Sequence, residues 1–339
     1  MKILVCGGAG FIGSNYVRYV LSRAEDEVVV LDKLTYAGNL ENLQAFVDNP
    51  RYSFIHGDIS DPQAVGAAMR EIDAVVNFAA ESHVDRSILD PQGFITTDVY
   101  GTYTLLEAAR AAGVSRFLQV STDEVYGEVI GTASPEDSAL RPRSPYSASK
   151  AGAEHLVYAY FVTYGLPTLI TRGSNTFGPY QYPEKLIPVV ITEAIDSHVV
   201  PIYGDGKQIR DWLFVEDHCA GIDSVLRTGA PGEAYNVGGD NLRNNLDLVE
   251  QILDLLWRPR SLIQHVPDRP GHDRGYSIDS SKLLGLGWSG ARSFAQALEQ
   301  TVRWYVENEP WWRRIKESAD YQAYFRSNYG DRESLALAK

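Results

Sequence analysis

Short apolar runs and longer amphipathic stretches alternate through the first half of the chain. Each apolar run ends in a polar or glycine-rich turn and is followed by a stretch with helical periodicity. Strands that alternate with helices of crossover length predict an α/β fold built on a doubly wound parallel sheet of the Rossmann type. The runs that we assign to strands of this sheet are residues 3–5, 28–31, 54–59, 74–80, 117–120 and 168–172.

The pattern changes in the second half of the chain, where turns and short elements follow one another closely. Residues 179–206 and 241–330 are therefore predicted to form a smaller mixed α/β domain that binds the substrate. The segment 207–240 contains one more apolar run, residues 234–237, which we expect to return to the main sheet. The large domain then consists of residues 1–178 and this returning segment.

A glycine-rich turn follows the first predicted strand at once. It reads Gly7-Gly8-Ala9-Gly10-Phe11-Ile12-Gly13, and its G-x-G-x-x-G spacing lets a pyrophosphate approach backbone N–H groups at a helix start. Asp32 ends the second predicted strand, where a carboxylate accepts hydrogen bonds from ribose hydroxyls and repels a 2′-phosphate. A glycine turn without a ligand is the alternative, but strand, turn, helix and acid occur in the order that a dinucleotide site needs. The sequence therefore predicts NAD in preference to NADP.

Polar or small residues also follow the third and fourth apolar runs. Asp58 is placed to meet the adenine, although a plain turn residue fits this position equally well. Ala79 and Ala80 suit close contact with a flat cofactor, and a dense polar cluster follows at residues 81–87. We interpret His83 in this cluster as a hydrogen-bonding loop residue, because it has no partner at a metal-ligand spacing.

Two further motifs carry candidate chemistry. Thr122-Asp123-Glu124 follows the fifth run, and therefore lies in the crevice at a strand's carboxyl end, where open α/β sheets bind ligands. Ser144-Pro145 is predicted to cap and begin a helix on which Tyr146 and Lys150 share one face. A lysine ammonium lowers the pKa of a neighbouring tyrosine from about 10 and makes it a base for an alcohol proton. Two adjacent carboxyl groups repel each other, which raises one pKa and places an acid beside a base.

Composition and charge narrow the class of protein. A chain of 339 residues, 44% hydrophobic and 22% charged, is typical of a soluble enzyme with one large or two closely joined domains. The net charge of −13 argues against a nucleic-acid or membrane-surface partner, because both need clustered Lys and Arg. Cys6 and Cys219, the two cysteines, indicate neither a disulfide framework nor a zinc site. The first apolar stretch breaks at Gly7, too early for a signal peptide or a membrane span, so we expect a cytoplasmic protein.

Taken together, these motifs resemble the dTDP-glucose 4,6-dehydratase family within the extended short-chain dehydrogenase/reductase superfamily. The glycine turn and the Tyr-x-x-x-Lys spacing mark only the superfamily, whereas the Thr-Asp-Glu triplet and two charged loops mark the dehydratases. The similarity runs from Met1 to about Trp312. It includes the segments 79–87, 178–181, 183–188, 210–212 and 269–273.

The resemblance implies an NAD-dependent hydro-lyase that dehydrates dTDP-glucose to dTDP-4-keto-6-deoxyglucose in deoxysugar biosynthesis. Oxidation at C4 makes the C5 proton acidic, water then leaves across C5–C6, and the hydride returns to C6. In these roles Tyr146 is the base at the 4-hydroxyl, with Lys150 beside it and Thr122 hydrogen-bonded near the same position. Asp123 is then the acid at C6, and Glu124 the base at C5.

The resemblance also implies the residues that surround the ligands, and it implies no metal. The cofactor contacts are Gly7, Gly10, Phe11, Ile12, Gly13, Asp32, Asp58, Ile59, Ala79, Ala80, Ser82, Ser121, Tyr146 and Lys150. The substrate contacts are Ser82, Thr122, Asn175, Lys185, Leu186, Tyr203, Arg210, Asn245, Arg269 and Tyr276. A homodimer is implied as well, paired through the helices at 102–112 and 146–164, whose apolar faces exceed what one crossover helix needs.

Several positions depart from the family's usual residues, among them Cys6 in place of a threonine and Phe177 in place of a tyrosine. Asp98 replaces an asparagine, Gly173 a cysteine and Thr176 an asparagine, while Gly275 replaces an arginine next to Arg274. None of them is a catalytic candidate. The charged loops also suggest an arginine clamp on the substrate's phosphates, for which Arg274 is a further candidate, although a single arginine fits a surface ion pair equally well.

Two alternatives are distinguished by the carboxyl pair. A nucleotide-sugar 4-epimerase or decarboxylase of the same fold needs NAD and the Tyr/Lys pair, but carries small hydroxyl residues in place of Asp123 and Glu124. A non-catalytic NAD-sensing protein of this fold would lack the tyrosine or the carboxylates. Since all of these residues are present, the dehydratase is favoured.

Overall fold

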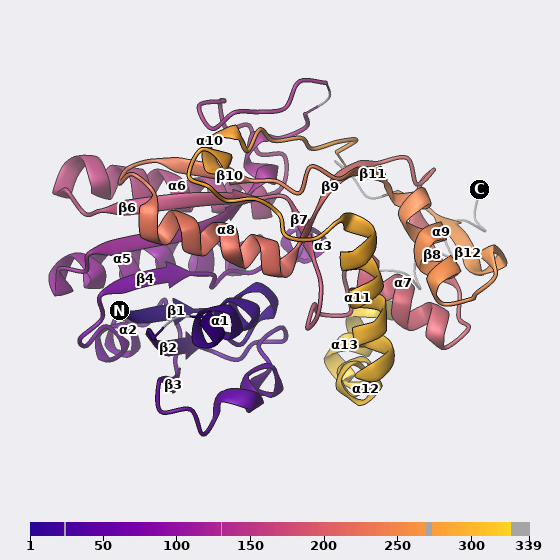
Figure 1. Cartoon of the computed structure of the whole chain (residues 1–339), viewed down its shortest axis with the longest axis horizontal. Helices are drawn as coiled ribbons and strands as arrows, with labels where there is room; N and C mark the ends of the chain where they lie inside the picture. Colours follow the sequence, from indigo (N-terminus) through magenta and orange to yellow (C-terminus); the bar gives the residue numbers. More distant parts are fainter. Residues whose placement is uncertain (24, 130, 269–272, 327–339) are drawn as a thin grey trace.

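A seven-stranded parallel sheet forms the centre of the molecule, in a computed structural model that describes residues 1–23, 25–129, 131–268 and 273–326 (Figure 1). Its strands are β1 (Lys2–Cys6), β2 (Glu27–Asp32), β3 (Tyr52–His56), β4 (Ala74–Asn77), β5 (Arg116–Thr122), β6 (Thr168–Gly173) and β10 (Ala234–Val237). Their order across the sheet is β10-β6-β5-β4-β1-β2-β3. The predicted doubly wound sheet is confirmed. The strand order reverses direction between β1 and β4, and ligands bind at such a switch point.

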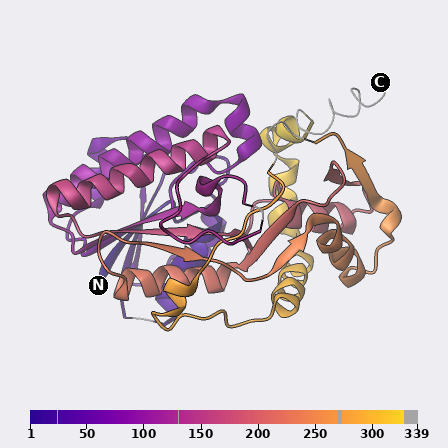
Figure 2. The same ribbon diagram turned by 90° about the horizontal axis from the view of Figure 1, so that it is seen from above.

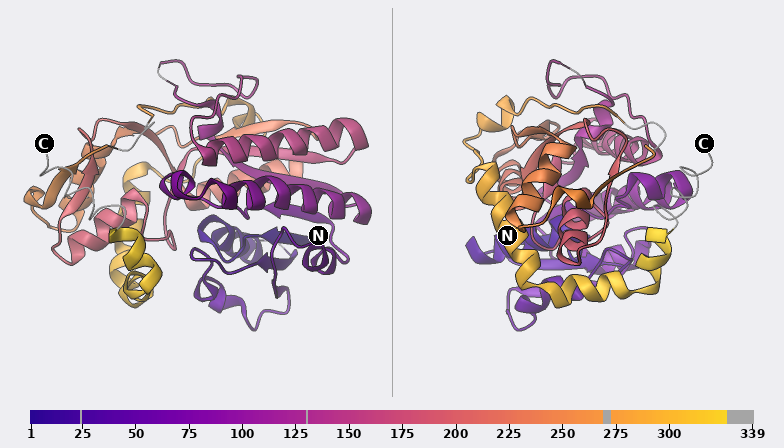
Figure 3. Two further views of the ribbon diagram at one scale, coloured as in Figure 1. Left: turned by 180° about the vertical axis from the view of Figure 1, so that it is seen from behind. Right: turned by 90° about the vertical axis from the view of Figure 1, so that its right-hand side faces the viewer.

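Successive residues of each strand face two separate hydrophobic cores. Ile3 and Val5 of β1 belong to one core, and Leu4 and Cys6 to the other. Helices α1 (Phe11–Arg23) and α8 (Val215–Thr228) cover the first core, while α2 (Pro62–Ala68), α5 (Thr102–Ala112) and α6 (Pro145–Tyr164) cover the second. Figure 3 shows α5 and α6 side by side across the second face. Burial on both faces explains why the strands read as continuous apolar runs.

Helix α6 begins where the sequence predicted. Ser144 is its N-cap and forms a capping box with Ser147, while Pro145 occupies the first turn. The helix ends at Gly165, whose left-handed conformation suits glycine. These signals determine where the helix begins, and therefore where the side chains of its first turns are placed.

Smaller sheets and helices gather beside the carboxyl ends of the main strands (Figure 2). Strands β7 (Asn175–Phe177), β9 (Ile209–Phe214) and β11 (Leu242–Asn244) form one small sheet, and β8 (Val200–Tyr203) pairs with β12 (Ile263–Val266). The helices of this part are α7 (Leu186–Ile195), α9 (Asn245–Leu255), α11 (Phe294–Glu307), α12 (Glu309–Glu317) and α13 (Ala319–Phe325). As the sequence indicated, the run at 234–237 returns to the main sheet as β10.

Short helical segments make up the remaining regular structure. They are η1 (Leu40–Phe46), α3 (Val84–Leu89), α4 (Pro91–Phe94), the π-helix η2 (Ile95–Gly101), η3 (Asp123–Tyr126), η4 (Arg260–Leu262) and α10 (Ser281–Leu284). The third and fourth strands end earlier than their apolar runs, because the residues after His56 and Asn77 leave the sheet. Among the described residues, every helix is too short or too polar to cross a bilayer.

Candidate active site

A cavity of about 400 Å³ lies at the carboxyl ends of the central strands and extends toward the smaller sheets. Its lining comes from the turns after β1, β2, β4 and β5, from the start of α6, and from the second part of the chain. Most residues predicted to bind ligands therefore meet in one place. Those that line it are Gly7, Gly10, Phe11, Ile12, Gly13, Asp32, Ile59, Ala79, Ala80, Ser82, Ser121, Thr122, Asp123, Glu124, Tyr146, Lys150, Asn175, Lys185, Leu186, Tyr203, Arg210 and Asn245.

The glycine turn after β1 allows other backbone segments to lie very close to it. Gly7 has φ 74°, and a Cβ there would lie 2.6 Å from the backbone nitrogen of Ala79 at the end of β4. At Gly13 a Cβ would collide with the carbonyl oxygen of Gly7. The chain can therefore turn directly into α1, whose first N–H groups border the cavity and form a site for an anion.

Asp32 ends β2 with a buried carboxylate beside this turn. It accepts hydrogen bonds from the backbone N–H of Ala9 at 2.9 Å and of Leu34 at 2.8 Å. Burial raises its pKa, while these two bonds and His56 act in the opposite direction. The remaining lone pairs suit a ribose diol, so the donor set fits the adenosine half of NAD.

Tyr146 and Lys150 meet the cavity from the first turns of α6. The ammonium of Lys150 is 4% exposed and donates to the carbonyl oxygen of Val120 at 2.7 Å. Burial raises the pKa of Tyr146 well above its usual value, and Glu124 and Asp98 raise it further. The predicted lowering of this pKa by Lys150 is thus wrong for the protein alone. The reason is that the burial of Tyr146 itself and the charges of Glu124 and Asp98 determine the direction of the shift.

The Thr122-Asp123-Glu124 triplet turns out of β5 into the cavity through the short helix η3. Thr122 caps this helix by accepting from the N–H of Glu124, and its hydroxyl donates to Asp123 Oδ1 at 3.2 Å. Burial raises the pKa of Asp123 well above its usual range, and the charges of Glu124 and Asp211 add to the shift. Asp123 Oδ2 is buried and hydrogen-bonds to none of the described residues. The prediction that one of the two carboxyl groups has a raised pKa is confirmed for Asp123, and this shift favours the protonated form of its carboxyl group.

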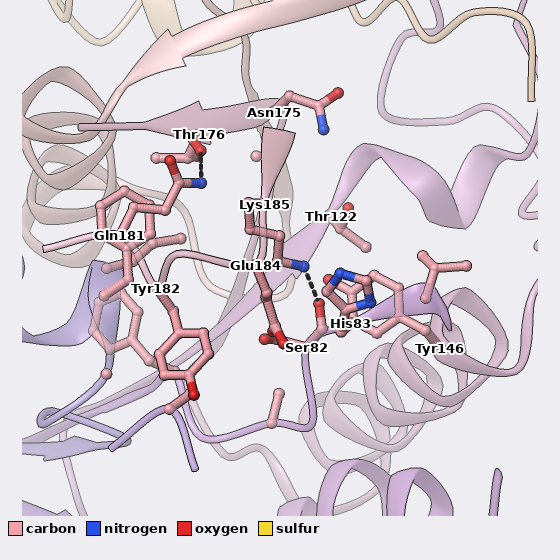
Figure 4. A pocket seen from close by; sticks show the side chains of 18 of the residues that line it. Ser82, His83, Thr122, Tyr146, Asn175, Thr176, Gln181, Tyr182, Glu184 and Lys185 are labelled. Carbon is pink, nitrogen blue, oxygen red and sulfur yellow. Dashed lines mark hydrogen bonds between the residues drawn. The ribbon is translucent and has the colours of Figure 1, made fainter. Parts of the chain in front are cut away.

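The far side of the cavity is polar and is seen in Figure 4. Lys185 precedes α7, and its ammonium donates to the carbonyl oxygen of Ser82 at 2.7 Å, which joins the loop after β4 to the second part of the chain. The side-chain oxygens of Asn175 and Asn245 are buried without hydrogen bonds to the described residues. Unpaired buried amide oxygens in a cavity indicate where a polar ligand donates hydrogen bonds.

Some predicted residues lie elsewhere. Asp58 and Tyr276 are absent from the described lining of the cavity, and Arg269 falls outside the described residues. Tyr276 lies under the guanidinium of Arg210, with its ring centre 4.6 Å from the guanidinium carbon, so it supports a residue that does line the cavity. Arg274 pairs with Asp205, the surface ion pair that the sequence left open.

His218 is a lining residue that the sequence analysis missed. Its Nδ1 lies 2.8 Å from the hydroxyl of Thr176, and burial lowers its pKa to about 3. A Cβ at Gly173 would lie 2.5 Å from its ring, so the glycine at this unusual position makes room for the histidine. A lone histidine on a helix gave no signal, because only the folded chain places it behind β6 and β7.

The site is suited to acid–base chemistry with a dinucleotide. No group of His, Cys, Asp and Glu side chains within the described ranges is arranged to hold a metal ion. His83, which we interpreted as a loop residue, accepts from the N–H of Asp85 and caps α3. A phenol, a carboxyl group with a raised pKa and a second carboxyl group border one cavity, beside an anion site at the start of α1.

Known proteins match the chain along most of its length. The family model of GDP-mannose 4,6-dehydratase matches residues 4–301. The dTDP-glucose 4,6-dehydratase of Xanthomonas campestris pv. campestris is 52% identical, over 91% of this chain and 94% of that protein. The low-salt glycan biosynthesis protein Agl12 of Haloferax volcanii is 51% identical, over 91% of this chain and 100% of that protein. A crystal structure of DesIV, a dTDP-glucose 4,6-dehydratase from Streptomyces venezuelae with NAD and TYD bound, has a TM-score of 0.92 and 49% identity, over 93% of this chain and 100% of that one.

Proposed function

The chain belongs to the GDP-mannose 4,6-dehydratase family, and we propose that it converts dTDP-glucose to dTDP-4-keto-6-deoxyglucose in deoxysugar biosynthesis. It is an NAD-dependent hydro-lyase with the fold of the short-chain dehydrogenases/reductases. The observation that carries the assignment is the buried Asp123, whose pKa is raised, beside Glu124 at the end of β5 and in one cavity with Tyr146. A C4 oxidation alone needs only the tyrosine, whereas loss of water also needs an acid and a second base.

NAD supplies the hydride acceptor for C4 and the same hydride for C6. The residues that would hold it are the glycine turn, the start of α1 and Asp32, which together form an anion site next to a ribose acceptor. The oxidised nicotinamide ring also carries a positive charge. Because Tyr146 is buried and its pKa is raised, a positive charge nearby favours the phenolate that has to take the 4-hydroxyl proton.

The elimination falls to the carboxyl pair. The raised pKa of Asp123 favours its protonated form, which can give its proton to the departing 6-hydroxyl. Glu124 removes the C5 proton, which the ketone at C4 has made acidic. Thr122 hydrogen-bonds to Asp123 and lies in hydrogen-bonding contact with Tyr146, so it joins the two halves of the site.

The nucleotide occupies the far side of the cavity in this proposal. Residues 1–178 and 207–240 hold NAD, while residues 179–206 and 241–330 hold the nucleotide sugar. Support for this division comes from the buried amide oxygen of Asn245, which lines the cavity from the second part of the chain. Asn175 and Arg210 belong to the first set of segments, and they line the same cavity. The remaining substrate contacts are those that the sequence analysis assigned, including Arg269 outside the described residues.

We further propose that the protein is a cytoplasmic homodimer that binds neither nucleic acid nor membrane. The net charge of −13 disfavours polyanionic partners. The exposed outer faces of α5 and α6 carry several large apolar or aromatic side chains, which suit an interface between copies of the chain.

The experiment that tests the function is NMR analysis of the product formed from dTDP-glucose. A new C6 methyl signal and a C4 ketone are expected, and a parallel reaction with UDP-glucose should be slower if thymine is recognised. A product with an inverted C4 and an intact 6-hydroxyl would instead establish the epimerase alternative. An unchanged sugar would refute both.

A further inference from the structure

Asp98 is a buried acid directly behind the Tyr146/Lys150 pair. It lies in the π-helix η2, and it is 1% exposed. Its Oδ1 accepts from the backbone N–H of Glu81 at 2.9 Å, and its Oδ2 accepts from the hydroxyl of Ser149 at 2.5 Å. Ser149 is the neighbour of Lys150 on α6, so this carboxyl connects the loop after β4 to the catalytic helix. Local π-helical turns are frequent at functional sites.

The charged groups around the Asp98 carboxyl group determine how it acts on Lys150. Lys150 is the opposite charge that most stabilises the carboxylate. Glu81 opposes it, but Glu81 is paired with Lys33 at 3.6 Å. Glu154 also acts on Lys150, yet this carboxylate is engaged by a buried guanidinium of β6. Among the described residues, Asp98 is therefore the carboxylate that acts on Lys150 and forms no ion pair of its own within 4 Å.

We propose that Asp98 is a positioning residue whose buried carboxylate holds Lys150 as the ammonium and sets the pH range in which the Tyr146/Lys150 pair works. The inference rests on the proposed function, since it concerns the C4 oxidation step. Burial raises the pKa of Asp98 to about 6, while Lys150 and Ser149 act against this rise. The charge is thus present at neutral pH and is lost within a range that an enzyme meets.

The direction of the effect follows from electrostatics alone. An anion raises the pKa of every ionisable group near it, so Asp98 raises the pKa of Lys150 and that of Tyr146. Asp98→Asn removes the charge while it keeps the shape. The amide oxygen can still accept from Glu81, and the amide nitrogen can donate to Ser149, whose hydroxyl also donates to the carbonyl oxygen of Tyr146 at 2.8 Å.

The test compares the wild-type holoenzyme with Asp98→Asn and Ser149→Ala. Each is mixed rapidly with dTDP-glucose, and the rate at which reduced nicotinamide forms is followed from about pH 5 to about pH 10. In Asp98→Asn both limbs of the profile should lie about one pH unit lower than in the wild type. The rate on the acid limb is then about tenfold higher, and the two proteins converge below about pH 6, where the wild-type carboxyl is already neutral.

A second readout does not depend on turnover. In protein labelled with ¹³C at the aspartate carboxyl carbons, the resonance missing from Asp98→Asn belongs to Asp98, and it should titrate near pH 6. In Ser149→Ala it should titrate higher, because the anion loses a hydrogen bond. Superimposable rate profiles for the wild type and Asp98→Asn, or a midpoint in the ordinary aspartate range, would overturn the proposal. Absence of a product with a C6 methyl group in the wild type would instead refute the proposed function, while the resonance still reports whether Asp98 titrates.

Discussion

Asp123 and Tyr146 divide the reaction between two steps that can be separated. Asp123→Asn keeps the size and most hydrogen bonds of the side chain, but it cannot deliver a proton to the leaving hydroxyl. A positioned acid is worth roughly 10²–10⁴-fold, so turnover should fall by a factor in that range. Oxidation at C4 should survive, which leaves reduced nicotinamide visible in a single turnover with dTDP-glucose.

Tyr146→Phe is the matched control for that prediction. It removes the base for the 4-hydroxyl and should suppress both the reduced nicotinamide and the product. If the two variants are equally silent in the absorbance of reduced nicotinamide, the proposed division of labour is wrong.

His218 makes the free energy of unfolding depend on pH, and His218→Gln should reduce this dependence. Burial lowers its pKa to about 3, whereas an unfolded histidine titrates near about 6.5. The unfolded chain thus binds the proton first, and this contribution to stability is complete above about pH 6.5 and is lost as the pH falls. One residue should cost about 2 kcal/mol between pH 6.5 and pH 5. Urea unfolding at both pH values should show this loss in the wild type and a smaller one in His218→Gln.

At the residue scale, the sequence predicted which residues belong to the site better than it predicted their burial and their neighbours. The neighbours Asp123 and Glu124 are adjacent in the chain, so their repulsion and the raised pKa were visible before folding. The pKa of Tyr146 depends on burial and on Asp98, which only the fold brings together. For the same reason His218 escaped notice, since its contact with Thr176 joins residues far apart in the chain.

Among the elements, α6 matters most because its first turns carry Tyr146 and Lys150. Ser144→Ala removes one side of its capping box and should lower the free energy of unfolding by about 1 kcal/mol. Turnover should fall as well, because the frayed turn contains the base. Denaturant unfolding and steady-state rates measured on the same preparation test both effects.

Ser293→Ala is the control for this prediction. Ser293 begins α11 with a capping box of the same kind, and it is not among the described residues that line the cavity. A similar loss of stability is expected, with unchanged turnover. Equal effects of the two substitutions on the rate would mean that the first turn of α6 has no special role.

Elements with a strong local signal were the ones that the sequence predicted. The buried strands are continuous apolar runs, and Ser144-Pro145 marks the start of α6 in the same way. The π-helix at Ile95–Gly101 and the small sheet of β7, β9 and β11 were not foreseen. The small sheet depends on pairing between distant segments, and the π-helix on a single extra residue per turn. Neither leaves a periodic pattern in the sequence.

For the whole molecule, the cavity unites segments that lie far apart in the sequence. Gly7 meets the end of β4, and Lys185 reaches the loop that carries Ser82. The doubly wound parallel sheet could be predicted from the alternation of strands with helices of crossover length. The position of the second part of the chain could not be predicted, since its short elements have no dominant hydrophobic pattern. Their position follows only from packing against the carboxyl ends of the main sheet.

The outer surface of α5 and α6 leads to the prediction of a homodimer. Tyr158 and Val162 are 55% and 63% exposed, and they share one face of α6, four residues apart. Tyr103 of α5 is exposed as well, beside Tyr100 with ring centres 5.9 Å apart. A stable interface buries about 1,000 Å² or more, and two long neighbouring helices related by a two-fold axis can supply it. Sedimentation velocity at micromolar concentration should show a dimer.

Substitutions on this face of α6 test whether its exposed side chains form a dimer interface or are ordinary surface residues. Tyr158→Glu combined with Val162→Glu places like charges opposite each other across a two-fold axis, so the dimer should dissociate into folded monomers. Trp257→Glu is the control, because Trp257 is 93% exposed at the end of α9 in the second part of the chain, away from α6. It should leave the dimer intact. A wild-type monomer, or a double variant that stays dimeric, would show that α5 and α6 do not pair two copies of the chain. Since both positions are exposed in the single chain, each monomer should keep its fold, and near-ultraviolet circular dichroism can verify this.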